Sequence, residues 1–316
     1  MTINETVTPL DPDARAVADQ LAAVIPGGLS SLGVAGVREF GRQRDAQTPA
    51  GPDVHAVTDD QVDGPHGNIP VRVYRPESDT PTAVLIYVHG GGWVFGTLDG
   101  GVDHLCRSIV STTGVAVVSV DYRMAPEHKF PVPVDETAAV LAWVRGEAGD
   151  LGFDSSRIAI GGDSAGGNIS AAITHLDRGA DSPLAAQVLL YPVTEYGVER
   201  PSWIDNAEAP VLTARDAPWF WTQYLRTDAD RSDPRATPAN SDSFAGLPPA
   251  LVITAGHDLL RDDGLHYAEL LDGAGTPVRV ERLDGTFHGF MTVPGLASYD
   301  RGVKAIAAFL TDVFGH

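Results

Sequence analysis

The segment 161–168 places a serine where it could act as a nucleophile. Its sequence is GGDSAGGN, so Ser164 is the centre of a Gly-x-Ser-x-Gly pattern. Glycines on both sides of a serine permit a sharp turn that lifts the hydroxyl above a sheet edge and lets neighbouring backbone approach closely. A serine hydroxyl is a poor nucleophile until a base accepts its proton. The pattern therefore predicts acyl transfer, and it requires a histidine and an acid elsewhere in the chain.

The histidine that best fits the role of base is His288. It lies in segment 284–290 (DGTFHGF), a loop that follows the predicted strand Pro277–Leu283. His257 directly precedes the acid candidate described below, and His266 falls on a predicted helix, so neither has a loop of its own from which to reach the serine. A neutral imidazole takes the serine proton and later returns it to the leaving group.

Three aspartates compete for the role of acid. Asp258 lies in the loop just beyond the predicted strand Ala250–Thr254. Asp262 and Asp263 lie instead where carboxylates cap and charge the first turn of the next predicted helix, Leu265–Leu271. The acid must reach the second ring nitrogen of the histidine, where it fixes the tautomer and steadies the imidazolium. We therefore predict that Asp258 is the acid.

A glycine-rich turn precedes the serine motif. The predicted strand Ala83–Val88 runs directly into HGGGW at positions 89–93. Three glycines at a strand end leave backbone N–H groups free to point into a site, where they would stabilise an oxyanion. A flexible turn is the more usual meaning of a glycine cluster, but it does not explain the histidine followed by three glycines. We expect His89 itself to organise this loop by hydrogen bonding.

Short apolar runs separated by helical segments supply the strands that must hold these loops. The predicted strands are Ala83–Val88, Val115–Val120, Arg157–Ile160, Gln187–Tyr191, Ala250–Thr254 and Pro277–Leu283. This alternation predicts a parallel sheet with helices on both faces, and segment 54–74 predicts an antiparallel hairpin at its edge. The chain order of serine, acid and histidine, each after its own strand, indicates the α/β-hydrolase fold.

Two segments lie outside this strand–helix alternation. Residues 13–45 show two short helical patterns that are broken at Pro26–Gly28. Between Pro192 and Pro248 the alternation stops, and aromatic residues gather in segment 219–224 (WFWTQY). These aromatic side chains could be ordinary packing, part of a hydrophobic wall for an acyl chain, or both.

Segment 121–131 (DYRMAPEHKFP) mixes charges, rings and prolines directly after a predicted strand. We interpret it as a rigid loop near the edge of the site. A buried polar network that holds this loop accounts for its charged residues better than direct catalysis does.

The composition excludes several classes of partner. The 22 basic and 42 acidic residues give a net charge of −20, which repels phosphate backbones, so we expect no nucleic-acid partner. The excess of acidic residues is spread along the chain, which predicts a surface that keeps the protein soluble. Adaptation of the protein to high salt is left open. Cys106 is the single cysteine and is predicted to be a core residue. No cluster at metal-ligand spacing occurs, so we expect neither a metal nor a cofactor.

We also expect no association with a membrane. Segment 1–20 is acidic and lacks the basic and apolar regions of a secretory signal. The longest apolar runs are strand-sized, well short of the ~20 residues of a membrane helix. These features predict a cytoplasmic protein. No linker or repeat divides the chain, so residues 1–316 are expected to form a single domain.

Five motifs taken together resemble the bacterial hormone-sensitive-lipase-like (family IV) esterases of the α/β-hydrolase superfamily. They are HGGGW at 89–93, DYRMAPEHKFP at 121–131, GDSAGGN at 162–168, LPPALVITAGHDLLRDDG at 247–264 and HGF at 288–290. The likeness covers roughly residues 70–310. The five motifs together are specific for this family, whereas a lone Gly-x-Ser-x-Gly pattern is a weak signal.

The resemblance implies a triad of Ser164, Asp258 and His288 and a small-molecule ester as substrate. It also implies that the N–H groups of three residues form the oxyanion hole, namely Gly91, Gly92 and Ala165. We expect substrate contacts from four aromatic residues, Trp93, Trp219, Phe220 and Tyr191.

The resemblance further implies a cap made of residues 1–45 and 195–235, inserted on a core of residues 50–194 and 236–316. A homodimer is left open. The sequence departs from the family at Asp258-Leu259-Leu260, where Asp-Pro-Leu is usual, and at His257. Because leucine lacks the fixed φ of proline, the acid loop is expected to be more mobile.

Two alternatives to a short-chain carboxylesterase stay open. The same triad could cleave an amide, a carbamate, a lactone or an acetylated sugar or drug, because fold and triad do not name the substrate. A non-catalytic receptor for a small molecule on the same fold would be expected to lose the base or the acid, and here neither is lost.

Overall fold

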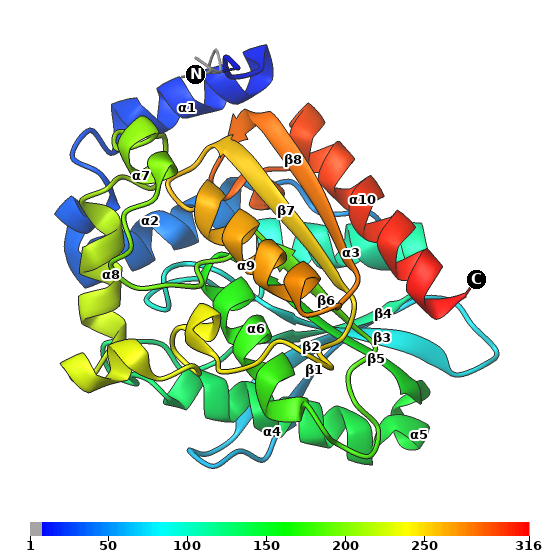
Figure 1. The fold of residues 1–316 in the computed structure, drawn as a ribbon. Coiled ribbons are helices and arrows are strands. Elements are labelled where there is room, and N and C mark those ends of the chain that lie inside the picture. The colour runs from blue at the N-terminus through cyan, green and yellow to red at the C-terminus, as the bar shows by residue number, and fades with distance from the viewer. Residues whose placement is uncertain (1–7, 316) are drawn as a thin grey trace.

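The computed structural model describes residues 8–315, which form an eight-stranded sheet between two layers of helices (Figure 1). The order of strands across the sheet is β1-β2-β4-β3-β5-β6-β7-β8. Their bounds are Ala56–Val62 (β1), Ile69–Arg75 (β2), Thr82–Val88 (β3), Ala116–Val120 (β4), Phe153–Asp163 (β5), Ala186–Leu190 (β6), Ala250–His257 (β7) and Val278–Phe287 (β8).

The sheet is parallel from β4 to β8 and antiparallel at the other edge. β2 pairs antiparallel with both β1 and β4, so the predicted hairpin is confirmed. The predicted parallel sheet is confirmed as well, because β3 pairs parallel with β4 and β5, and β6, β7 and β8 follow in the same direction. Parallel strands end at one edge, so the loops after β3, β5, β7 and β8 meet there.

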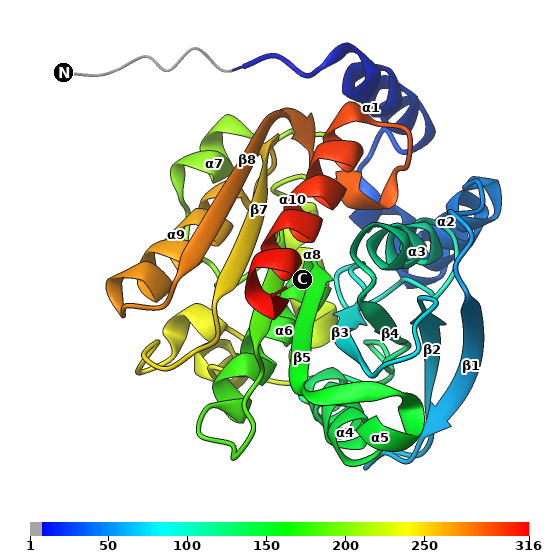
Figure 2. The ribbon, with the colours of Figure 1, turned by 90° about the vertical axis from the view of Figure 1, so that its right-hand side faces the viewer.

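Helices cover both faces of the sheet (Figure 2). One face carries α3 and α10, and the other carries α4, α6 and α9. The helix bounds are Gly101–Thr113 (α3), Val132–Gly146 (α4), Ala148–Leu151 (α5), Ala165–Asp177 (α6), Arg261–Gly273 (α9) and Ala297–Phe314 (α10).

The apolar strand runs are explained by burial on both faces. Alternate side chains of a strand point to opposite faces, so in β3 Val84, Ile86 and Val88 pack with α4 and α6. Leu85 and Tyr87 pack on the other face with α3 and α10. Such strands read as continuous apolar runs and not as an alternation. Cys106 is fully buried in the second of these layers, as predicted.

β5, β7 and β8 are longer than their apolar runs, and the differences at β5 and β8 are the largest. β5 begins at Phe153, four residues before the predicted start. The apolar run missed this part of the strand because residues 154–157 are polar and exposed or half-exposed. β8 continues past Leu283 to Phe287, where Phe287 pairs with His257 after an irregularity in the ladder. The extra length of β8 carries its last residues into the interior beside the serine loop.

Two segments lie outside the sheet and its layers. The N-terminal segment forms α1 (Pro12–Val24), a 3₁₀ turn at Leu29–Leu32 and α2 (Gly33–Gln47). The segment after β6 forms α7 (Pro201–Asp205), α8 (Asp216–Tyr224) and two 3₁₀ turns. The carboxylate of Asp216 accepts a hydrogen bond from the N–H of Ser30 at 2.8 Å, so the two segments touch.

Helix α2 is fastened to the loops at the strand ends by Arg38. Its guanidinium donates to the carbonyl oxygens of Val94 and Ala125 and pairs with Glu127 at 2.6 Å. The hydrogen bond from Arg38 lowers the pKa of Glu127 to about 2. The charged segment 121–131 thus holds the N-terminal segment in place.

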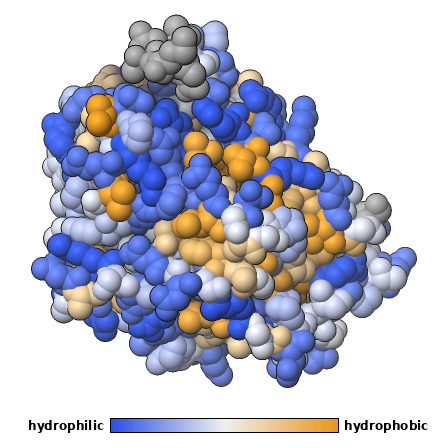
Figure 3. Space-filling model, in the orientation of Figure 1, coloured by the Kyte–Doolittle hydropathy of each residue, from blue (hydrophilic) through white to orange (hydrophobic). Residues whose placement is uncertain are grey.

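Residues 12–47 contain a stretch that is long and apolar enough to span a membrane by length and composition, and 22% of it is buried in the structure. This range is not one continuous helix, because the break predicted at Pro26–Gly28 separates α1 from α2. On the face seen in Figure 3, hydrophilic side chains cover most of the periphery, and hydrophobic side chains gather toward the centre.

Candidate active site

Ser164 sits at a strained turn between β5 and α6. Its backbone has φ 54° and ψ −116°, a conformation that costs a non-glycine residue about 1–3 kcal/mol. The turn fits only because of the small residues around it. A Cβ added to Gly166 would lie 1.9 Å from the carbonyl oxygen of Val88, so a larger residue there would collide with backbone.

The structure brings the three predicted residues together. His288 Nε2 lies 2.9 Å from Ser164 Oγ, and His288 Nδ1 lies 2.8 Å from Asp258 Oδ2. All three side chains are buried. We assign the ring proton to Nδ1, because an ionised carboxylate only accepts, and Nε2 is then free to accept the serine proton.

The competing acids are engaged elsewhere. Asp262 pairs with Arg261 at 2.7 Å and accepts a hydrogen bond from the N–H of Ser202 at 2.8 Å. Asp263 is buried near Glu195 and Thr194, and burial raises its pKa well above its usual range. Neither contacts His288 within the part of the chain that the structure describes.

The other two histidines considered above also lie away from the serine. His257 Nε2 is 2.8 Å from the carbonyl oxygen of Thr8, and His266 pairs with Glu195 at 3.2 Å.

The glycine turn after β3 offers free donors beside the serine. Gly91 has φ 104°, and a Cβ there would lie 1.8 Å from the carbonyl oxygen of Phe95. Among residues 8–315, none accepts a hydrogen bond from the N–H of Gly91 or Gly92. Ala165 begins α6, where N–H groups have no partner within the helix. Three donors are therefore available near Ser164, as an oxyanion hole requires.

A carboxylate joins the glycine turn to the serine turn. Asp163 accepts hydrogen bonds from the N–H of Gly90 at 2.9 Å and from the Tyr87 hydroxyl at 2.8 Å. Asp163 is not among the residues predicted from the sequence. In the sequence, the indication of this role is that an aspartate stands directly before the serine of the Gly-x-Ser-x-Gly pattern. A carboxylate that is buried there needs hydrogen-bond donors.

His89 organises the turn in the predicted manner. Its ring stacks on Tyr122 at 4.4 Å, and its Nδ1 lies 2.8 Å from the carbonyl oxygen of Gly90. The Tyr122 hydroxyl donates to the carbonyl oxygen of His89, and Arg123 pairs with the buried Glu136. The network predicted for segment 121–131 is confirmed by these bonds.

The segment after β6 holds the acid loop. Asn206 Nδ2 donates to the carbonyl oxygens of Gly256 and Asp258, at 3.2 and 2.9 Å. Ser202 Oγ donates to the carbonyl oxygen of Leu259 at 2.7 Å. Sequence reasoning missed both residues, because nothing in the pattern pairs α7 with a loop about fifty positions away.

A small cavity opens at Ser164, which we call the inner cavity. Its volume is about 80 Å³, room for two or three water-sized groups. Its lining includes Ser164, His288 and the glycine turn. Its apolar walls come from the N-terminal segment (Leu29, Gly41), from the segment after β6 (Val211, Leu212, Phe220), and from Phe95 and Val102 in the chain after β3. Arg44 and Asp45 of α2 also line it.

A second and larger space, the outer cavity, meets the site at His288. Its volume is about 420 Å³, and its walls come from α1, α2 and the segment after β8. It is lined by Val17, Gln20, Leu21, Val24, Phe40, Gln43, Arg44, Gln47, Thr48, Pro49, Val211, Phe287, His288, Gly289, Thr292, Val293 and Pro294.

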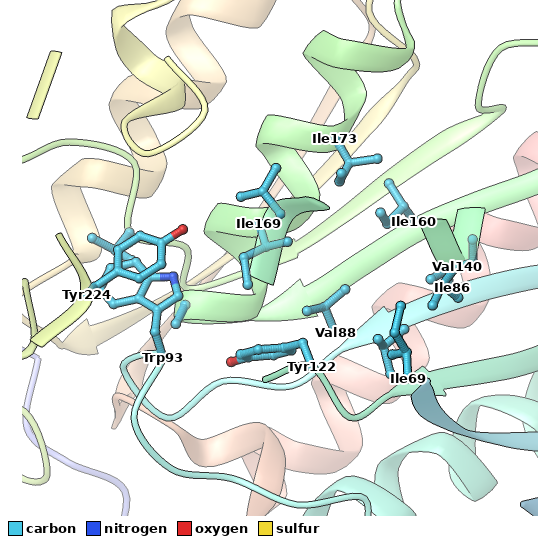
Figure 4. Close-up of a cluster of buried hydrophobic side chains, with 14 of the residues drawn as sticks. Ile69, Ile86, Val88, Trp93, Tyr122, Val140, Ile160, Ile169, Ile173 and Tyr224 are labelled. Carbon is cyan, nitrogen blue, oxygen red and sulfur yellow. The ribbon is translucent and has the colours of Figure 1, made fainter. Parts of the chain in front are cut away.

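Of the four aromatic residues predicted to contact substrate, Phe220 alone lines the inner cavity. Trp93 is buried in a stack with Tyr224, 4.2 Å between ring centres (Figure 4), and this stack ties α8 to the glycine turn. Tyr191 packs edge-on against His288 at 4.9 Å, and Trp219 packs edge-on against Phe220 at 4.9 Å. Trp93, Trp219 and Tyr191 line neither cavity and pack behind the walls, and contact of these three residues with substrate stays a prediction.

Among residues 8–315, no group of three or more His, Cys, Asp or Glu side chains is arranged to hold a metal ion.

Comparison with known proteins agrees with this architecture. Residues 85–292 match the family described as alpha/beta hydrolase fold. The carboxylic ester hydrolase LipN of Mycobacterium tuberculosis is 43% identical over 252 residues, 77% of this chain and 66% of LipN. The esterase LipI of the same organism is 38% identical over 88% of this chain and 89% of its own.

Solved structures show the same fold. A hyperthermophilic esterase from the archaeon Pyrobaculum calidifontis superposes with a TM-score of 0.88 and 38% identity, over 97% of this chain and 98% of that one. The motifs, the strand order and these matches agree, and the chain belongs to the hormone-sensitive-lipase-like esterases of the α/β-hydrolase superfamily.

Proposed function

We propose that this protein is a serine carboxylesterase that hydrolyses short-chain acyl esters through an acyl-Ser164 intermediate. The observation that carries the proposal is the unbroken hydrogen-bonded series from Ser164 Oγ to His288 and on to Asp258, at 2.9 and 2.8 Å. The names of the related proteins, carboxylic ester hydrolase and esterase, support the same reaction class.

In the first half of the reaction, Ser164 Oγ attacks the ester carbonyl carbon while its proton passes to His288 Nε2. The negative charge that develops on the carbonyl oxygen is stabilised by the N–H groups of Gly91, Gly92 and Ala165. The carbon–oxygen bond to the alcohol then breaks, and His288 gives its proton to the departing oxygen.

In the second half, water takes the place of the alcohol. His288 accepts a proton from water as the water oxygen attacks the acyl carbon, and the bond to Ser164 Oγ breaks. The serine oxygen recovers the proton from His288, and the acid is released. Asp258 holds the imidazole in the required tautomer in both halves.

The inner cavity supports a preference for short acyl groups. At about 80 Å³ it admits a few carbon atoms before a longer chain meets Phe220 and its neighbours. We propose that the N-terminal segment and the segment after β6 act as the cap, since both contribute walls. Activity should be highest for acetyl to hexanoyl esters and fall steeply for long-chain lipids.

The test is a panel of nitrophenyl esters of rising chain length with wild type and Ser164→Ala. We expect a maximum of kcat/KM at short chains, and loss of hydrolysis in Ser164→Ala while circular dichroism shows an intact fold. Mass spectrometry of a quenched reaction should show the acyl group on the peptide that contains Ser164. Hydrolysis near the wild-type rate in Ser164→Ala would contradict the triad, and faster cleavage of a matched amide would favour the amidase alternative.

We further propose that the enzyme is cytoplasmic, has no nucleic-acid partner and is a homodimer. The net charge of −20 supports the second point. The third is supported by β8, an edge strand that pairs with β7 alone among the described strands, although the carbonyl oxygen of Gly285 near its end accepts the N–H of Asp11. Cell fractionation and light scattering on the purified protein test these points, and a monomeric mass would contradict the dimer.

A further inference from the structure

Arg44 carries a positive charge to the walls of the active site. It lies on α2 and lines both the inner and the outer cavity. No carboxylate of residues 8–315 lies within 4.0 Å of its guanidinium, although most arginines of the chain have such a partner. Its Nε is buried, and no described residue accepts a hydrogen bond from it. A buried donor without a partner is costly unless a ligand satisfies it.

The nearby carboxylates are already engaged. Asp45 accepts a hydrogen bond from Thr97 Oγ1 at 2.8 Å, and burial raises its pKa, which favours its neutral form. Asp163 is held by Tyr87 and Gly90, and Asp258 by His288. The charge of Arg44 is therefore available to a substrate.

The position of Arg44 indicates which part of the substrate meets it. His288 gives its proton to the alcohol oxygen, so the alcohol leaves on the side of His288. The outer cavity contains His288 and Gly289 but neither Ser164 nor the glycine turn, so it suits the alcohol part of the ester. Arg44 lies on the wall of this cavity, and its planar guanidinium fits a carboxylate with two parallel hydrogen bonds.

We propose that Arg44 selects esters whose alcohol part carries a carboxylate. The proposal rests on the esterase function proposed above and names the class of substrate for that site. The net charge of the chain is −20, which by itself repels anionic substrates. The positive charge of Arg44 at the cavity wall would offset this repulsion locally.

Matched substrates test this selection. The acetyl esters of 3- and 4-hydroxybenzoate carry a carboxylate where those of 3- and 4-hydroxybenzamide carry a neutral carboxamide of similar shape, and all four release a phenol that absorbs. We expect the ratio of kcat/KM for the carboxylate over the amide to exceed one for at least one isomer. In Arg44→Gln this ratio should fall by about 10-fold or more, since hydrogen bonds between charged groups contribute that much.

Arg42→Gln is the matched control. Arg42 lies two positions away on the same helix, is exposed and pairs with Glu39 at 2.7 Å, so its removal changes net charge equally. The ratio in this variant should equal that of wild type. As a readout independent of the chemical step, the hydroxybenzoate that was preferred as an ester should inhibit wild type more strongly than its amide, and Arg44→Gln should remove that difference.

The outcomes separate the two proposals. A ratio of one or below for both isomers in wild type, or a ratio that Arg44→Gln leaves unchanged, would overturn the role of Arg44 while ester hydrolysis itself stands. An equal fall of the ratio in Arg42→Gln would also overturn it, because the effect would then come from net charge. Failure of the esterase function would appear separately, as hydrolysis that survives Ser164→Ala.

Discussion

Asp163 Oδ1 accepts the backbone N–H of Gly90 at 2.9 Å, and this one hydrogen bond joins the turn that carries the nucleophile to the turn that carries the oxyanion donors. The two turns follow β5 and β3, which pair in register up to Gly162 and Val88, and this hydrogen bond extends the connection beyond the last pair of the ladder. The donors must lie about 2.7–3.1 Å from the oxyanion to act. The hydrogen bond between Asp163 and Gly90 is therefore a positioning contact for catalysis.

We expect Asp163→Ala to lower kcat more than it raises KM, because the Gly91 and Gly92 donors matter most in the transition state. A loss of about 10²–10³ in kcat would match the removal of one oxyanion donor. Tyr87→Phe is the control, since it removes the other hydrogen bond to Asp163 but leaves the one to Gly90. Equal losses in both variants, or a change in KM alone, would contradict the positioning role.

The assignment of Asp258 as the acid predicts different effects for substitutions at Asp258 and at Asp262. Asp258→Asn keeps the shape of the side chain but holds His288 in the wrong tautomer, so kcat should fall by about 10⁴. Asp262→Asn disturbs an ion pair with Arg261 and should have a much smaller effect. Steady-state kinetics on a short-chain ester decide between them. If Asp262→Asn is the more damaging change, the acid has been misassigned.

The wall of the inner cavity can be tested with two neighbouring aromatic residues. Phe220→Ala removes a side chain that lines the cavity, so the preferred acyl chain should become longer by several carbons. Each added CH₂ that is buried contributes about 0.8 kcal/mol to binding. Trp219→Ala should leave the preferred length unchanged, because Trp219 does not line the cavity. A shift of the same size in both variants would show that general loosening, and not the wall, sets the preference.

The N-terminal segment provides a coarser test of the cap. Deleting residues 1–40 removes α1, Leu29 and the anchor Arg38, which opens walls of both cavities without touching Ser164, Asp258 or His288. The chain-length profile should become flatter while hydrolysis of short esters persists. A truncated protein that folds and keeps the full-length profile would show that this segment is not part of the substrate pocket.

Stability toward acid should depend on His175. Burial against Tyr267 lowers the pKa of this imidazole from 6.5 to about 4. Between these values the unfolded chain binds a proton that the folded chain does not, so stability is lost as the pH falls from 6.5 toward 4. The loss is on the order of 1–3 kcal/mol.

Urea unfolding of wild type and His175→Gln at several pH values measures this loss. The difference in unfolding free energy between wild type and variant should shift in favour of the variant as the pH falls through that range. His128→Gln, a change at an exposed side chain, is the control. Parallel pH profiles for wild type and His175→Gln would refute the assignment.

The parts of this site that were predictable are those that follow from local pattern. Apolar runs predicted the strands, and parallel strands end at one edge, so the sequence alone was enough to place Ser164, Asp258 and His288 together. The turn after β3 was also recognisable from local sequence, because three consecutive glycines indicate that other backbone segments approach it closely.

The residues that were missed act over long distances in the chain. Asn206 and Ser202 bind a loop about fifty positions later or more, and Arg38 binds loops at positions 94 and 125. The aromatic residues could not be told apart from the sequence. Trp93 and Phe220 have similar chemistry, and only the packing of α8 decides that Trp93 is buried in a stack while Phe220 faces the cavity.

The hydrogen bonds from Asn206 to Gly256 and Asp258 set a limit on how this enzyme can diversify. The segment after β6 both lines the inner cavity and binds the acid loop, so replacing the whole segment by that of a relative would disturb Asp258 unless Ser202 and Asn206 were kept. A smaller exchange, of residues 207–212 alone, would replace Val211 and Leu212 of the cavity wall and leave Ser202, Asn206 and the stack of Trp93 on Tyr224 in place.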